Sequence, residues 1–155
     1  MAKGKTNRDI GDILGMVREL ADYEKLLHEC VAMEKQFHEA LFGDTPRAEA
    51  LIGELDDEPI AFALFFHNFS TFVGKPGLYL EDLYVKPNMR GQGFGRRLLR
   101  HVARLALERG CGRLEWSVLD WNKSAIGFYE KLGAQEMNDW TVYRLTGDNL
   151  DTFGK

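Results

Sequence analysis

A chain of 155 residues with 45% hydrophobic and 28% charged residues has the size and composition of one soluble globular domain. Its net charge of -4 and its pI of about 5.6 favour neither nucleic acid nor an anionic membrane as a partner. No apolar run has the length of a membrane span, no signal peptide opens the chain, and two cysteines make no disulfide framework. Cytoplasmic residence is therefore the default prediction.

The first half of the chain changes from helical to strand periodicity. Residues 1–9 are polar and are expected to be irregular, with a single domain over residues 10–155. Apolar residues recur at helical spacing over 10–21 and again over 31–42. Residues 48–55, 60–69 and 78–85 are then predicted to be strands, with a loop at 68–77.

The second half alternates helices and strands. An apolar stripe from Leu98 to Ala106 predicts a helix that ends at Gly110. Residues 114–119 are predicted to be a strand, Asn122 to cap a further helix, and residues 140–145 to be the last strand. This order of elements predicts an α/β (α+β) fold built on a mixed sheet.

The most informative segment is the glycine-rich loop at residues 90–96, which lies between a predicted strand and a predicted helix. Its glycines allow close backbone approach to a ligand, and the unpaired N–H groups of a helix N-terminus favour an anion. The spacing excludes a P-loop, which requires Lys-Ser/Thr after the last glycine. It also excludes a dinucleotide fingerprint, because Arg96 stands where the third glycine belongs. The alternative is a glycine-rich loop that merely precedes an ordinary helix.

The spacing Arg90-x-x-Gly93-x-Gly95 resembles the acyl-CoA pyrophosphate loop of the GNAT family of N-acetyltransferases. The flanking blocks at 79–85 and 120–134, together with residues 19–25, resemble its diamine acetyltransferase branch, which acetylates polyamines or thialysine. The resemblance implies a GNAT fold: a seven-stranded, mostly antiparallel sheet with helices on both faces and two central parallel strands that diverge. Family members begin with an apolar strand that residues 1–9 hardly provide, so the first strand is expected to be weak or missing.

The resemblance also implies acetyl-CoA as co-substrate, with no metal, bound where the two central strands diverge. The pantetheine arm would pair with backbone groups of one strand as an added strand does, the loop amides would hold the pyrophosphate, and the turn after the next strand would flank the CoA arm. The cofactor-binding residues predicted in this way are Leu83, Tyr84, Val85, Arg90, Gly91, Gln92, Gly93, Phe94, Gly95, Arg96, Asn122, Lys123, Ser124 and Ala125.

Acetyl transfer to an amine requires a neutral nucleophile, a stabilised oxyanion and a proton for the departing thiolate. Glu81 is the predicted base, the N–H of Val85 the predicted oxyanion donor, and Tyr129 the predicted acid, each by its match to the family's motif. The alternatives are a solvated strand carboxylate for Glu81 and a core aromatic for Tyr129. Asp82 is expected on the opposite face of a regular strand, where it binds substrate ammonium or is structural.

The amine pocket is the least determined part of the prediction. The substrate-binding residues predicted are Tyr23, Glu24, Glu81, Asp82, Glu115, Trp116 and Ser117. Polyamine-specific relatives carry an aspartate where this chain has Ser70, so thialysine or lysine is the preferred acceptor and spermidine or spermine the alternative. A protein-lysine acetyltransferase, a CoA-binding sensor and a structural dimer module are the other hypotheses. The resemblance also implies a homodimer.

Overall fold

The computed structural model describes residues 2–4 and 9–155, and the chain divides into two compact units, residues 1–117 and 118–155. The first contains β1 (Ala2–Gly4), α1 (Ile10–Tyr23), η2 (Leu27–Glu29), α2 (Glu34–Phe42), β2 (Glu49–Leu55), β3 (Glu58–Ser70), β4 (Lys75–Val85), η3 (Pro87–Met89), α3 (Phe94–Glu108) and β5 (Leu114–Trp116). The second contains α4 (Lys123–Glu130) and α5 (Gly147–Phe153).

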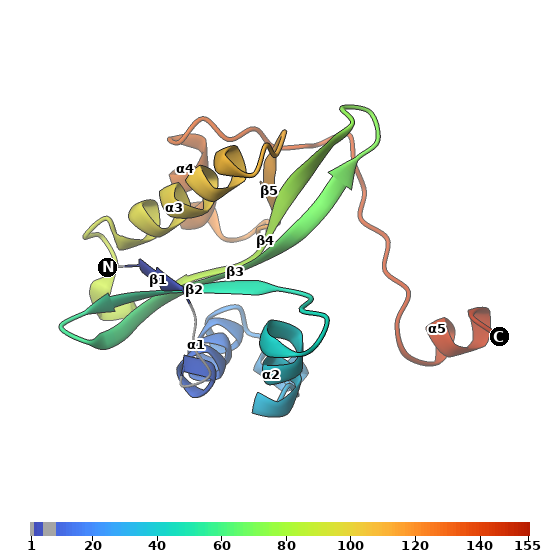
Figure 1. The fold of residues 1–155 in the computed structure, drawn as a ribbon, viewed down its shortest axis with the longest axis horizontal. Coiled ribbons are helices and arrows are strands. Elements are labelled where there is room, and N and C mark those ends of the chain that lie inside the picture. The colour runs from blue at the N-terminus through green and yellow to red at the C-terminus, as the bar shows by residue number, and fades with distance from the viewer. Residues whose placement is uncertain (1, 5–8) are drawn as a thin grey trace. The chain divides into compact units, whose positions relative to one another are not determined.

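The strands of the first unit form one mixed sheet in the order β1-β2-β3-β4-β5 (Figure 1). β1, β2, β3 and β4 pair antiparallel with one another in that order, and β5 is parallel to β4. The helices α1 and α2 lie against one face of this sheet and α3 against the other. The mixed sheet with helices on both faces agrees with the predicted fold, although five strands are found over the described residues and seven were expected.

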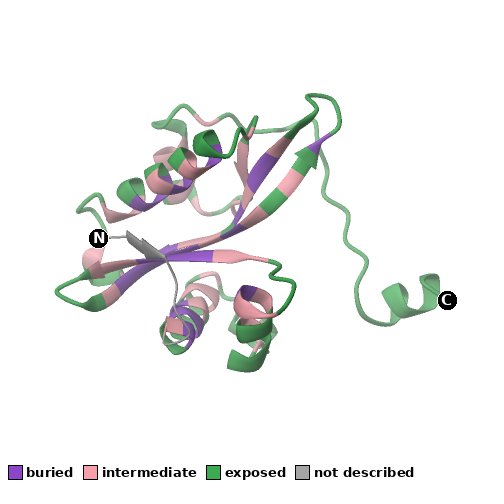
Figure 2. Cartoon of the chain, viewed as in Figure 1, coloured by how far each residue is buried: buried purple, intermediate pink, exposed green. Residues whose placement is uncertain are grey.

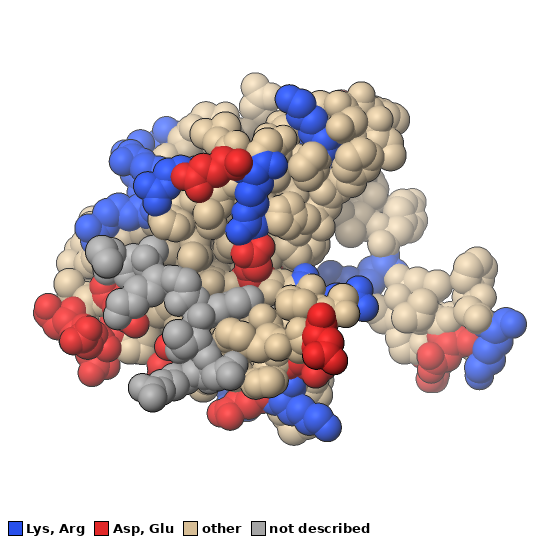
Figure 3. All heavy atoms as spheres, in the orientation of Figure 1, with Lys and Arg blue, Asp and Glu red and all other residues tan. Residues whose placement is uncertain are grey.

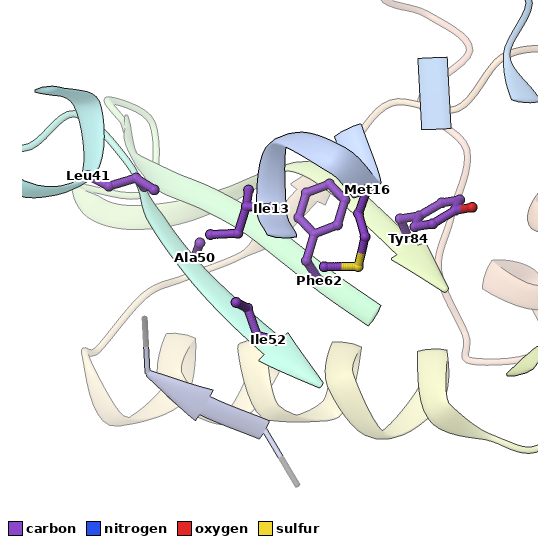
Figure 4. Packing of buried hydrophobic residues seen from close by; sticks show 7 residues of the cluster. All are labelled: Ile13, Met16, Leu41, Ala50, Ile52, Phe62 and Tyr84. Carbon is purple, nitrogen blue, oxygen red and sulfur yellow. The ribbon is translucent and has the colours of Figure 1, made fainter. Parts of the chain in front are cut away.

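The main core lies between the sheet and the α1–α2 layer. Helical spacing directs one side of α1 inward, and strand alternation directs every second side chain of β2 and β3 toward it (Figure 4). The buried members of this cluster are Ile13, Met16, Leu41, Ala50, Ile52, Phe62 and Tyr84. Figure 2 shows that burial is concentrated in the central strands and in the helix faces turned toward them. The sheet thus holds β4, the predicted catalytic strand, between two packed layers.

The second face of the sheet is covered by the apolar stripe of α3. Leu98, Leu99, Val102 and Ala106 are buried there, as the sequence predicted. Between them the helix presents exposed arginines, and Figure 3 shows basic side chains gathered over this helix. At its end, the Arg109 guanidinium donates to both carboxylate oxygens of Glu49, at 2.6 and 2.9 Å, and fastens the helix to β2.

Three predictions of local structure need correction. A short strand, β1, forms within the N-terminal stretch expected to be irregular and pairs with residues 51–53 of β2; residues 1 and 5–8 lie outside the described residues. The loop predicted at 68–77 shrinks to a four-residue turn, because β3 and β4 continue pairing to Ser70 and Lys75. β5 is also shorter than predicted, since it ends at Trp116.

The strand predicted at residues 140–145 is wrong. The segment lies outside every strand of the described residues, and Trp140, Val142 and Tyr143 are 70%, 82% and 92% exposed. Aromatic and β-branched residues favour strands through packing against neighbouring strands, so their alternation alone does not create one. The second unit instead gains α5, which the sequence analysis did not predict.

Candidate active site

The two parallel strands, β4 and β5, separate partway along their length at one edge of the sheet. β5 pairs with β4 only at Leu78, Tyr79 and Leu80, whereas β4 continues to Val85. The N–H of Lys86 donates to the Ile60 carbonyl of β3, at 2.9 Å. Because backbone groups alternate in direction along an antiparallel strand, Leu83 and Val85 turn their N–H and C=O groups toward the opposite edge. That edge has no strand pairing in the described chain beyond Leu80, which leaves the Leu83 groups and the Val85 N–H available to an extended ligand. The Val85 carbonyl already accepts from Arg90 Nε at 2.9 Å.

Tyr84, one of the three predicted pantetheine-binding residues, has a side chain with a structural part. Its side chain is 3% exposed within the core, and its hydroxyl donates to Glu19 Oε2 of α1 at 2.8 Å. Burial, together with this hydrogen bond, raises the pKa of Tyr84 to about 12. Tyr84 therefore fixes α1 against the strand from which its two neighbours present their backbone groups.

The glycine loop has the backbone conformation that its sequence predicted. Gly91 and Gly93 have φ of 77° and 82°, in the left-handed region, and α3 begins at Phe94 directly after Gly93. A Cβ atom added at either position would meet nothing within 4 Å. The glycines are thus required by conformation, and the space beside the loop is open. The first amides of α3 point out of a helix N-terminus, where an anion is favoured.

Three carboxylates near the end of α1 influence one another electrostatically. Burial, followed by the charges of Glu81 and Glu24, raises the pKa of Asp82 to about 7, and burial also raises the pKa of Glu24. The strand is irregular here: Asp82 pairs with Leu64 and Leu80 pairs with Phe65, so Glu81 is the extra residue of a β-bulge. The regular alternation assumed for Glu81 and Asp82 therefore does not hold. The exposed Glu81 and the half-buried Asp82 experience different environments.

The side chains of β5 are already engaged within the first unit. Glu115 Oε2 lies 2.7 Å from Arg113 Nε and accepts a hydrogen bond from Asn68 Nδ2 at 3.1 Å. Ser117 Oγ is 2.7 Å from the Tyr79 hydroxyl, just past the point where the strands separate. Asn68 and Tyr79 were not predicted as site residues, and the sequence carries no signal for contacts between positions so far apart.

Ser70, the residue that bears on amine specificity, closes the β3–β4 turn. It is 7% exposed, its hydroxyl accepts a hydrogen bond from the Val73 N–H at 3.3 Å, and its carbonyl accepts from Gly74. The hydroxyl therefore serves the backbone of the turn. An aspartate at this position would have to accept the same hydrogen bond from the Val73 N–H.

The second unit contains the predicted acid and the predicted turn beside the CoA arm. Asn122 caps α4 as predicted, since its Oδ1 accepts from the Ala125 N–H at 3.2 Å. Lys123 and Ser124 occupy the first turn of the helix and are exposed. Tyr129 is half-buried, with its ring centroid 5.2 Å from that of Phe128.

Replacing Asp82 by Asn is expected to stabilise the fold more at pH 8 than at pH 5. The folded-state pKa of about 7 lies above the ordinary value of 3.8, so the stability associated with protonated Asp82 is lost as pH rises through about 7. Asn cannot ionise, and the difference in unfolding free energy between variant and wild type should widen by about 2 kcal/mol. Thermal unfolding of both proteins at the two pH values measures it. Asp151→Asn, at an exposed aspartate of α5, is the control, and an equal difference at both pH values would contradict the expectation.

Comparison with known proteins agrees with this geometry. The model of the acetyltransferase (GNAT) family matches residues 11–134. The thialysine N-epsilon-acetyltransferase of Bos taurus is 39% identical over 153 residues, covering 92% of this chain and 89% of that protein. The L-ornithine N5-acetyltransferase NATA1 of Arabidopsis thaliana is 47% identical over 103 residues, covering 66% of this chain and 45% of that protein. An integron cassette protein from the mobile metagenome of V. cholerae superposes with a TM-score of 0.83 at 26% identity, over 100% of this chain and 97% of that one.

The chain therefore belongs to the GNAT family and is an N-acetyltransferase. Enzymes of this family use acetyl-CoA. The resemblance stated from the glycine loop and its flanking blocks is thus confirmed. Among the described residues, no helix is long and apolar enough to cross a membrane.

Proposed function

We propose that the protein transfers acetyl from acetyl-CoA to the primary amine of a small molecule, with thialysine or lysine as the preferred acceptor. The proposal of a small cationic acceptor is supported mainly by the acidic group of Glu24, Glu81 and Asp82. Burial and the charges of the other two carboxylates raise the pKa of Asp82 to about 7. A bound ammonium group would relieve that repulsion and favour the ionised carboxylate. The thialysine acetyltransferase of Bos taurus, at 39% identity over most of both chains, supports the same class of acceptor.

We propose that the CoA arm pairs with the open edge of β4 at Leu83 and Val85 and that the amides after Gly91 hold the pyrophosphate. The left-handed loop glycines, the open space beside them and the N-terminus of α3 support this placement. By the family resemblance, residues 122–125 are also proposed to bind the cofactor. Arg96 is exposed at the start of α3, where its charge would assist phosphate binding.

The protonation state of the amine determines the first step of the proposed reaction. An alkyl ammonium with a pKa of about 10.4 must lose a proton before it attacks the acetyl carbonyl, and Glu81 accepts that proton directly or through water. The Val85 N–H stabilises the oxyanion, and the Tyr129 hydroxyl donates a proton to the departing thiolate. Transfer is direct within a ternary complex, with no acetylated residue of the protein.

Gly93→Ala is expected to weaken CoA binding about tenfold. Alanine at the φ of 82° is strained by roughly 1 kcal/mol, and relief of that strain would turn the loop amides away from the phosphate. Gly110→Ala is the matched control, because Gly110 has a φ of 68° and open surroundings at the far end of α3. Isothermal titration with CoA should show weaker CoA binding in Gly93→Ala and unchanged binding in Gly110→Ala. Equal affinity of the two variants would contradict the loop's role.

A steady-state comparison of thialysine, lysine, spermidine and putrescine tests the acceptor. Thialysine or lysine should have the highest kcat/KM, and spermidine as the best substrate would favour the polyamine alternative. A lysine-containing peptide belongs in the same series, since a higher kcat/KM for the peptide would point to a protein acceptor. The homodimer implied by the family is a separate proposal, which light scattering of the purified protein tests.

A further inference from the structure

The Arg90 side chain turns away from the glycine loop that it opens. Its Nε donates to the Val85 carbonyl at 2.9 Å, and its guanidinium carbon lies 4.7 Å from the ring centroid of Tyr23 and 5.6 Å from that of Tyr84. Both separations are within the range of cation–π attraction. Arg90, the first residue of the loop, therefore contacts both the last residue of α1 and the end of β4.

One of these aromatic rings is held rigidly. Tyr84 is buried, and its hydroxyl is bound to Glu19, one turn before the end of α1. Tyr23 is 38% exposed and gives the guanidinium its closer ring, so it covers Arg90 from the side of the helix end. Glu24, one of the three carboxylates, follows Tyr23 immediately in the chain. A shift of Arg90 would thus affect the loop and the carboxylate group together.

We propose that Arg90 is a positioning residue that couples the CoA loop to the amine-binding end of α1 through its contact with Tyr23. The inference rests on the proposed placement of CoA. By holding the Val85 carbonyl and the Tyr23 ring, Arg90 fixes where the loop leaves β4, and hence where the amides after Gly91 lie. Tyr23 then contributes to CoA affinity through Arg90, without itself being part of the loop.

A direct phosphate contact by Arg90 is the competing account, and the two predict different results for Tyr23. If Arg90 served only as a charge near the phosphates, removing the Tyr23 ring would leave CoA affinity unchanged, and Arg90→Lys would retain most of it. If Arg90 positions the loop, the planar guanidinium matters as much as its charge. Lysine has neither the planar fork nor its stacking surface.

The test is a double-mutant cycle on CoA affinity, measured by isothermal titration. Tyr23→Leu should weaken binding about fivefold and Arg90→Ala about tenfold, from the lost cation–π contact and the lost hydrogen bond. The double variant should be no weaker than Arg90→Ala alone, since both substitutions remove the same contact. Tyr23→Phe retains the ring and should stay within about twofold of wild type. Melting temperatures check that each variant is folded.

Steady-state kinetics provides the second measurement. Tyr23→Leu should raise the KM for acetyl-CoA as well as that for the amine, and Tyr23→Phe should restore the KM for acetyl-CoA. Additive effects of Tyr23→Leu and Arg90→Ala, or unchanged CoA affinity in Tyr23→Leu, would overturn the positioning role and leave the CoA site intact. Absence of CoA binding to the wild-type protein would overturn both.

Discussion

Replacing Tyr129 by Phe should lower kcat about 100-fold while leaving CoA affinity close to that of the wild type. The substitution removes only the hydroxyl, which we assign to protonation of the departing thiolate. The half-buried ring, whose centroid lies 5.2 Å from that of Phe128, keeps its packing. Steady-state rates with saturating acetyl-CoA and thialysine, together with a CoA titration, measure the two quantities separately.

Tyr143→Phe is the matched control for this substitution. It makes the same chemical change at a side chain that is 92% exposed in the same unit of the chain. Its kcat should equal that of the wild type. Full activity in Tyr129→Phe would remove Tyr129 from the reaction, whereas a loss of CoA binding would indicate that its hydroxyl serves the cofactor site.

Glu81→Gln is the second substitution with a large expected effect: kcat should fall about 100-fold and its rise with pH should flatten. The bulge that exposes Glu81 gives its carboxylate access to solvent, through which the proton can leave. Asp82→Asn provides the contrast on the adjacent residue. With a pKa of about 7, Asp82 becomes anionic as pH rises through neutrality, so wild-type kcat/KM should increase there through better binding of the cationic amine.

The two variants should therefore differ in kind. Asp82→Asn should raise the KM for the amine and remove the increase of kcat/KM around pH 7, while Glu81→Gln should act mainly on kcat. Full pH profiles of both parameters for each variant give the measurement. If Asp82→Asn carried the loss of kcat instead, Asp82 would be the proton acceptor. Full activity in both variants would show that neither carboxylate takes part.

The features that were predicted from sequence are those that local chemistry determines. Gly91 and Gly93 lie in the left-handed region because the chain must turn there, and the spacing of the motif excluded two other phosphate-binding motifs. The stripe of α3 is buried as its periodicity requires. Asn122 caps α4 because its side chain reaches an unpaired N–H a few residues later in the chain.

The features that were missed depend on which segments meet in the fold. The bulge at Glu81 arises from the pairing of β4 with β3, and it separates the environments of two adjacent carboxylates that sequence treats alike. Arg90 contacts Tyr23, which lies 67 positions earlier in the chain, and no local pattern encodes such a contact. Residues 140–145 show the converse error, because a strand-like alternation formed no strand.

Initial rates with acetyl-CoA and thialysine varied together test the central claim most directly, because they report both turnover and the order of its steps. Direct transfer in a ternary complex predicts double-reciprocal plots that intersect, with one acetylated amine formed for each CoA released. Parallel lines would indicate an acetylated form of the protein and would contradict direct transfer. No CoA release above the uncatalysed rate, with thialysine or any other amine of the series, would contradict the account altogether.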